Sequence, residues 1–154
     1  MSKAMPTKWS GKEIGVTIGY AFLILLCFFA GDCLGFLGPF FWVYGVPIAL
    51  LIAGIPYFYI AAREQRYGTM TIVGVIFLLY GLLGGGLSNP PYLICTLIGL
   101  ICPDLVRMWM GYDSFVGTLV SYLVFAIARV GAQINVWVMP EWCHGQAIEE
   151  MGED

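Results

Sequence analysis

The placement of the charged residues constrains this chain most strongly. Uncharged runs cover residues 14–31, 33–62, 67–103 and 114–128, and only 11% of the 154 residues are charged while 60% are hydrophobic. A soluble domain of this length needs a polar surface that so few charged residues cannot supply. Apolar runs of about 20 residues instead fit helices that cross the hydrocarbon core of a bilayer. The sequence therefore predicts an all-α, polytopic transmembrane helical bundle.

Glycine and proline residues divide the two uncharged runs that are too long for one crossing. The segment Gly84-Gly85-Gly86-Leu87-Ser88-Asn89-Pro90-Pro91 is expected to end one helix and to start the next. The segment Gly35-Phe36-Leu37-Gly38-Pro39-Phe40 is expected to form a broken apolar loop. We therefore predict five spans, at about residues 13–31, 42–61, 69–86, 90–108 and 117–139.

The basic residues indicate how these spans are oriented. Five alternating spans place six of the seven Lys and Arg residues on one side, namely Lys3, Lys8, Lys12, Arg63, Arg66 and Arg107. By the positive-inside rule that side is cytoplasmic, and residue 145 lies outside. We expect residues 1–12 to form a cytoplasmic segment, residues 13–140 the transmembrane bundle of a multi-pass cell-membrane protein, and residues 141–154 an acidic extracytoplasmic tail.

The sequence contains no motif typical of an enzyme, a metal site or a nucleic-acid-binding protein. It lacks a Walker motif, Gly-x-Ser-x-Gly and His-Glu-x-x-His, and its single histidine, His144, lies in the tail. The five cysteines are scattered, and those within the spans are expected to be small apolar residues. No basic patch with interleaved aromatic residues suggests nucleic acid. We therefore expect no enzymatic activity, no metal or other cofactor and no nucleic-acid partner.

Arg129 is the most unusual residue of the predicted spans, because it lies near the middle of the membrane. An arginine at this depth costs about 2.5–3.5 kcal/mol on insertion scales, so its side chain should face the bundle interior and find a partner. Gln133 lies one helical turn further out on the same face. Two interpretations follow. Either Arg129 is a structural residue satisfied by Asp32 or by backbone carbonyl groups, or it contacts an anionic or polar ligand.

A ligand site around Arg129 would include polar residues at the outer ends of other spans. Asn89 and Tyr92 lie at the outer start of the fourth span, and Asp32 lies at the outer end of the first. Tyr92 is equally a candidate for an interfacial anchor, because tyrosine gathers at membrane surfaces. The candidate substrate-binding residues are Arg129, Gln133, Asn89, Tyr92 and Asp32.

The inner end of the fourth span carries Asp104 and Arg107, which are three residues apart. This spacing is typical of a pair of opposite charges at a helix end. Trp109 follows them and is one of five tryptophans near predicted span ends. Tryptophan is enriched at both membrane interfaces, so these positions support the placement of the spans.

Glycines recur at a spacing of four residues in two of the spans. Gly15 and Gly19 share one face of the first span, and Gly81 and Gly85 share one face of the third. This spacing lets two helix backbones approach closely in lipid. The approaching helix belongs either to this chain or, for Gly15 and Gly19, to a second subunit.

Residues 45–59 and 61–74 resemble a known family. The similar features are a span that ends in a basic loop, the pattern Gly68-x-x-Thr71-Ile72-x-Gly74 that opens the next span, and a glycine-rich outer end of that span. These features are similar to the MptD/Trep_Strep group of substrate-binding (S) components of energy-coupling factor (ECF) transporters. The likeness covers roughly residues 12–140.

The resemblance implies a function and a set of partners. S components bind a micronutrient from outside, in the outer half of the bundle, and dock on a transmembrane T component and two cytoplasmic ATPase subunits. The T-component contact maps to Gly15 and Gly19, with Ala30. Members typically have six spans, so we expect this chain to lack the sixth. We expect the substrate-binding subunit of an ECF-type micronutrient importer; the alternative is a small polytopic membrane protein with a structural or assembly role.

Overall fold

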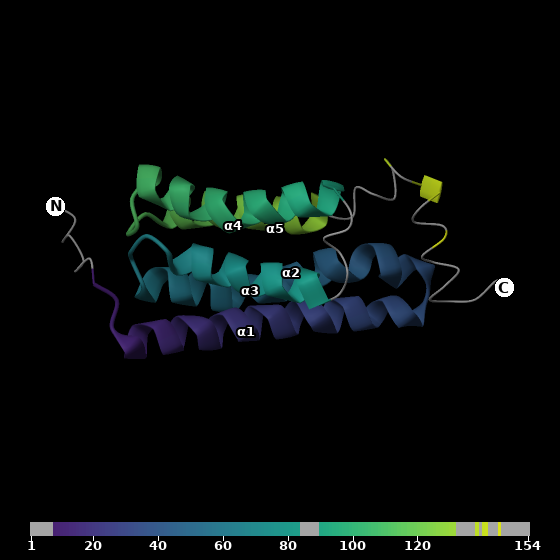
Figure 1. Cartoon of the computed structure of the whole chain (residues 1–154), viewed down its shortest axis with the longest axis horizontal. Helices are drawn as coiled ribbons and strands as arrows, with labels where there is room; N and C mark the ends of the chain where they lie inside the picture. Colours follow the sequence, from purple (N-terminus) through teal and green to yellow (C-terminus); the bar gives the residue numbers. More distant parts are fainter. Residues whose placement is uncertain (1–7, 84–89, 132–137, 139, 142–144, 146–154) are drawn as a thin grey trace.

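The protein is a bundle of helices that run side by side (Figure 1). A computed structural model describes residues 8–83, 90–131, 138, 140, 141 and 145. Its elements are α1 (Gly11–Leu34), the 3-10 turn η1 (Gly35–Leu37), α2 (Pro39–Arg63), α3 (Thr69–Leu83), α4 (Pro90–Met110) and α5 (Phe115–Gly131). The described residues contain no β-strand, and the predicted all-α transmembrane bundle is confirmed.

Three of these helices are long and apolar enough to cross a membrane, over Gly11–Leu37, Tyr44–Arg63 and Pro90–Met110. Thr69–Leu83 and Phe115–Val130 are shorter apolar helices. The predicted third and fifth spans continue to residues 86 and 139, beyond the segments that the structure describes. Each of the five predicted spans thus corresponds to one helix.

The start of α2 differs from the prediction. The expected broken loop over residues 35–40 is reduced to the turn η1, and α2 begins at Pro39 instead of residue 42. Gly38 has a φ of 143°, which only glycine adopts without strain. Pro39 then occupies the first helical turn, where its missing N–H removes no helical hydrogen bond. The chain therefore returns to helical structure directly after Gly38, at Pro39.

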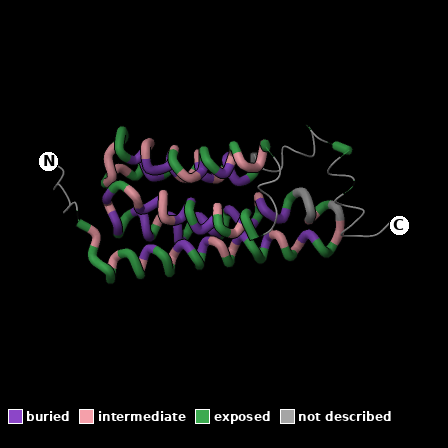
Figure 2. Tube along the Cα trace, viewed as in Figure 1, coloured by how far each residue is buried: buried purple, intermediate pink, exposed green. Residues whose placement is uncertain are grey.

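The helices pack in a closed order around the interior. α1 packs against α2 and α3, α4 packs against α3 and α5, and α2 packs against α5. Buried residues lie on the helix faces that turn inward (Figure 2). A hydrophobic cluster built from α1, α2, α3 and α5 fills the centre, and its larger members are Ile24, Phe28, Leu50, Tyr57, Ile60, Met70, Ile76, Phe77 and Phe125. The perimeter exposes large apolar side chains, as a surface in contact with lipid requires.

α4 differs from the other helices in what it buries. Its buried residues are Thr96, Gly99, Pro103, Asp104 and Arg107, so this face carries polar, small or proline residues. Apolar burial drives little helix association in lipid, where small residues and polar contacts decide packing. The contacts of this face therefore position α4 in the bundle.

We call the end of the bundle that holds the starts of α1, α3 and α5 and the ends of α2 and α4 the basic end, and the opposite end the distal end. Arg66 lies in the turn between α2 and α3 at the basic end. Its Nη2 is 2.8 Å from Glu13 Oε1 and 3.6 Å from Glu64 Oε2. Its guanidinium also lies 4.9 Å from the ring of Trp9. These contacts fix the start of α1 on the turn between α2 and α3.

Asp104 and Arg107 form no ion pair with each other in the described part of the chain, contrary to the sequence-based prediction. Asp104 Oδ2 instead accepts hydrogen bonds from the backbone N–H of Gly68 and Thr71, at 3.1 and 2.7 Å. Arg107 Nη2 donates to the carbonyl oxygen of Ala61 at 2.6 Å. The positive start of α3 attracts the carboxylate, and the negative end of α2 attracts the guanidinium. Each charged side chain therefore interacts with the end of a neighbouring helix.

Candidate functional site

Arg129 lies near the distal end of α5, with its side chain inside the bundle and only 2% of the residue exposed. Its Cζ is 5.1 Å from the ring centroid of Phe77 and 5.8 Å from that of Phe125. Nε and Nη2 are buried and have no hydrogen-bond partner among the residues that the structure describes. The inward direction is the one expected from the cost of exposing arginine to lipid. No ion pair of Arg129 is found within the described residues, and the rings do not supply a counter-charge.

The inner face of α4 places Gly99 against Arg129 and Thr96 one helical turn before Gly99. A Cβ atom at Gly99 would lie 3.1 Å from Nη2 and 3.6 Å from Nε of Arg129, so the absent side chain makes room for the guanidinium. Thr96 lies three residues earlier on the same helix face. It is fully buried, and its side chain lies within hydrogen-bonding reach of Tyr92 on the same helix. Buried polar groups from α4 and α5 are thus collected in one region of the bundle.

Tyr92 connects the two charged candidates of the sequence analysis. It lies close enough to both Arg129 and Asp32 for an electrostatic interaction. Its ring packs over Gly81 of α3, where a Cβ atom would lie 2.8 Å from the phenolic oxygen. Gly81 therefore provides close packing within the chain. The other two candidates, Asn89 and Gln133, lie outside the described residues.

Asp32 does not form the ion pair with Arg129 that the sequence allowed. Its carboxylate accepts a hydrogen bond from the hydroxyl of Tyr80 at 2.8 Å, which joins the distal end of α1 to α3. No ion pair between Asp32 and Arg129 is found within the described residues. The structure therefore does not support the interpretation in which Asp32 is the ion-pair partner of Arg129.

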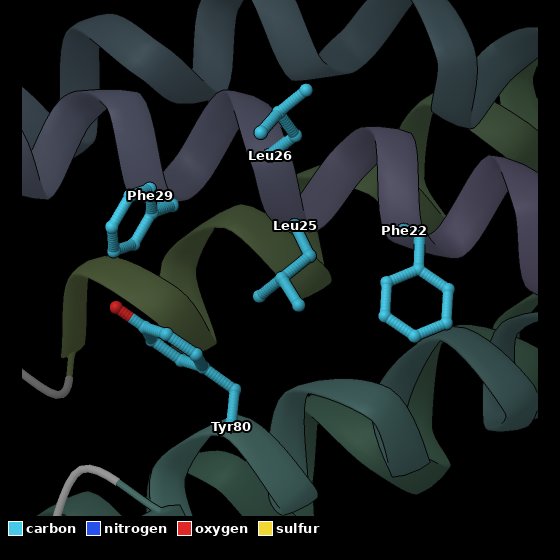
Figure 3. A pocket seen from close by; sticks show the side chains of 5 residues that line it. All are labelled: Phe22, Leu25, Leu26, Phe29 and Tyr80. Atoms are coloured by element: carbon cyan, nitrogen blue, oxygen red, sulfur yellow. The ribbon is translucent and has the colours of Figure 1, made fainter.

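A shallow pocket of about 160 Å³ lies beside this hydrogen bond, between α1 and α3. It is lined by Phe22, Leu25, Leu26, Phe29 and Tyr80, and Tyr80 leans from α3 toward Phe29 on α1 (Figure 3). Phe22, Leu26 and Phe29 are about half exposed, so the pocket opens on the outer surface of the bundle. The lining of this pocket carries no charged group. The pocket therefore lacks the polar side chains that lie near Arg129.

The small face of α1 is open. Gly15 and Gly19 are exposed, and a Cβ atom at either position would meet no atom within 4 Å. Ala30 is exposed as well. Packing of Gly15 and Gly19 against another described helix of this chain is therefore excluded. The other alternative left by the sequence, contact with a second subunit, stays a prediction.

Four further residues near Arg129 are not among the candidates predicted from the sequence, namely Thr96, Gly99, Phe77 and Phe125. A signal for the first two exists, because Thr96, Gly99 and Pro103 are spaced three and four residues apart and share one face of a helix. The two phenylalanines carry no such signal. They are apolar residues within apolar runs, and only the packing of α3 and α5 brings them to the guanidinium.

A family model for a hypothetical bacterial integral membrane protein (Trep_Strep) matches residues 12–154. No curated protein and no solved structure matches the chain. The match covers all five described α-helices except the first residue of α1, and it agrees with their apolar character. The chain is therefore a multi-pass membrane protein that belongs to the Trep_Strep family.

Proposed function

We propose that this protein is the membrane-embedded substrate-binding subunit of an ECF-type micronutrient importer, and that it is not an enzyme. The observation that carries the proposal is Arg129, which is buried and makes no hydrogen bond to any described residue. Arg107 also has two nitrogens without a partner among the described residues, but it donates to the carbonyl oxygen of Ala61, as expected of a structural arginine. A polar or anionic solute would supply acceptors and a counter-charge to Arg129.

The position of Arg129 suits uptake from outside the cell. The other described Lys and Arg residues lie at the end of the bundle opposite Arg129, and the positive-inside rule makes that end cytoplasmic. The N-terminus is then cytoplasmic, residue 145 is outside, and Arg129 lies in the outer half of the membrane. The substrate would enter from the distal end, past Tyr92 and the hydrogen bond between Asp32 and Tyr80.

The open face of α1 supports the proposed partners. Gly15 and Gly19 form a smooth surface that no described part of the chain covers. A helix of a transmembrane T component could approach this surface closely. ATP hydrolysis would be carried out by two cytoplasmic ATPase subunits. The same face also fits the second candidate function, a structural or assembly role, because any subunit with a helix in the membrane could dock there.

Purification of the full chain from its native membrane, with mass spectrometry of bound proteins and small molecules, tests the proposal. We expect a T component, two ATPases and one small molecule. Arg129→Gln should lose the small molecule and keep the protein partners. Arg63→Gln is the matched control, because the Arg63 side chain is 46% exposed at the basic end. Recovery of other membrane proteins without ATPases or a small molecule would favour the structural role.

A further inference from the structure

The bundle contains two tightly packed parts. In the first part, α1 and α2 meet backbone to backbone, because a Cβ atom at Gly31 would lie 2.5 Å from Cβ of Ala49 and 2.8 Å from the carbonyl oxygen of Gly45. In the second part, α3 meets α4 closely, because a Cβ atom at Gly74 would lie 2.6 Å from Cα of Leu100. Such close approach holds helices together in lipid. Since α5 packs against α4, the second part consists of α3, α4 and α5.

The seam between α2 and α5 joins these two parts by hydrogen bonds. The hydroxyl groups of Tyr57 and Ser121 form a hydrogen bond at 2.7 Å, and the hydroxyl of Tyr122 donates to the carbonyl oxygen of Leu50. The two positions on α2 are about two helical turns apart, so the bonds fix this seam over that length. The basic end adds the hydrogen bond from α4 to the end of α2 described above.

The seam between α1 and α3 joins the same two parts and is looser. The pocket of about 160 Å³ leaves part of this seam unfilled, and Tyr80 leans across it toward Phe29 (Figure 3). The ring centroid of Phe28 on α1 lies 5.2 Å from that of Phe77 and 6.3 Å from that of Tyr80. Apolar contacts of this kind are exchanged for lipid contacts at little cost, whereas the hydrogen bond from Tyr80 to Asp32 has to break for the helices to part.

This looser seam leads to Arg129. Phe77 carries both contacts, because its ring meets Phe28 of α1 and its centroid lies 5.1 Å from Cζ of Arg129. On the side of α4, Gly99 packs against the guanidinium, so a solute needs an opening elsewhere to reach it. Movement of α1 away from α3 would uncover Phe77 and the arginine next to it.

We infer that the distal seam between α1 and α3 is the gate through which a solute reaches Arg129, and that the hydrogen bond from Tyr80 to Asp32 holds this gate closed. The inference rests on the proposed function and names the contact that controls access to the same site. The opening pivots on the bonded seam between α2 and α5. At the basic end, the ion pair of Arg66 with Glu13 keeps the start of α1 in place.

Labelling of a buried thiol measures the opening. Thr96→Cys, in a background with the five native cysteines replaced by alanine, places the thiol at a fully buried position beside Tyr92. The full chain in lipid nanodiscs is treated with a charged, membrane-impermeant thiosulfonate, and mass spectrometry gives the rate of modification. We expect Tyr80→Phe to raise this rate about tenfold, because it removes one hydrogen bond to a charged acceptor and keeps the ring. An unchanged rate would overturn the gate. Should Thr96→Cys fail to fold, native Cys95, which interacts electrostatically with Arg129, replaces it as the labelled residue.

Two controls locate the opening. Ser121→Cys places the thiol at a fully buried position in the seam between α2 and α5, and Tyr80→Phe should leave its rate within about twofold. Tyr122→Phe is the matched variant, because it removes one tyrosine hydroxyl from the other seam, and it should affect labelling of Thr96→Cys less than Tyr80→Phe does. An equal gain at Ser121→Cys, or an equal effect of Tyr122→Phe, would show general loosening and overturn the gate.

The labelling and the purification from native membranes separate this inference from the proposed function. Protein that carries a T component, ATPases and a small molecule, but labels no faster in Tyr80→Phe, would overturn the gate and leave the importer standing. Faster labelling in Tyr80→Phe without recovery of ATPases or a small molecule would overturn the importer and leave the opening of this seam standing.

Discussion

Replacement of Asp104 tests most directly how α4 is held in the bundle. Asp104 is fully buried, and its Oδ2 accepts three hydrogen bonds, from the backbone N–H of Gly68 at 3.1 Å and from the backbone N–H and hydroxyl of Thr71, both at 2.7 Å. These donors belong to the start of α3, where the helix dipole favours negative charge. A single carboxylate on α4 thus caps α3 from the side.

The expected cost of Asp104→Ala follows from these contacts. Each hydrogen bond to a charged acceptor contributes about 1.5–3 kcal/mol, although the three do not add, because they share one oxygen. Removing one partner of a buried charged network costs about 3–5 kcal/mol, and we expect a loss of this size in the free energy of unfolding. Asp104→Asn keeps an oxygen acceptor and loses only the charge, so its expected cost is smaller, roughly 1–2 kcal/mol.

The measurement is unfolding of the purified protein by SDS titration in mixed micelles, followed by circular dichroism. Asp113 provides the control, because it is exposed in the turn between α4 and α5. We expect Asp113→Ala to remain within about 0.5 kcal/mol of the wild type. If Asp104→Ala costs no more than this control, the carboxylate does not cap α3, and the account of α4 packing is wrong.

Three further predictions concern the partner face, the topology and the arginine. Gly15→Leu should leave the yield of folded protein unchanged and reduce the recovery of the T component and ATPases; wild-type recovery would remove the docking role of this face. In a background without native cysteines, Lys3→Cys should label from the cytoplasm and Gly145→Cys from outside, and labelling of both from one side would contradict the five-span topology. Because Arg129 and Asp32 form no ion pair and share only the neighbour Tyr92, the coupling energy between Arg129→Gln and Asp32→Asn should stay below about 1 kcal/mol in denaturation experiments. Rescue of one change by the other would contradict the structure.

The helices were predictable because membrane spans leave a strong local signal. Long uncharged runs, interrupted by Gly84-Gly85-Gly86 and by Pro90-Pro91, locate the boundary between α3 and α4 without any knowledge of packing. The start of α2 was less predictable. Gly38 and Pro39 predict a break in the chain, whereas one positive φ and one proline in the first helical turn are enough to restart a helix.

The contacts of charged residues were predictable only in part. The spacing of Asp104 and Arg107 indicates that the two side chains are neighbours on one helix, but it does not indicate which other helix ends lie beside them. Asp104 forms a hydrogen bond with the start of α3, and Arg107 forms one with the end of α2. The dipole at each of these helix ends has the sign that attracts the side chain. For Arg129 the insertion cost predicts an inward direction, and it gives no information on the rings or the glycine that surround the guanidinium.

The hydrogen bonds that join α4 to other helices lie toward the basic end in the described part of the chain. There Asp104 binds α3, Arg107 binds α2, and the hydroxyl of Ser121 on α5 donates to the carbonyl oxygen of Pro103 at 2.9 Å. Toward the distal end, Arg129 of α5 makes no hydrogen bond to a described residue. Polar contacts hold helices together in lipid, so α4 is fixed at the basic end and is expected to adjust most easily beside Arg129. A polar or anionic ligand of the proposed kind would supply acceptors to Arg129 there, while the basic end keeps its packing against the start of α1.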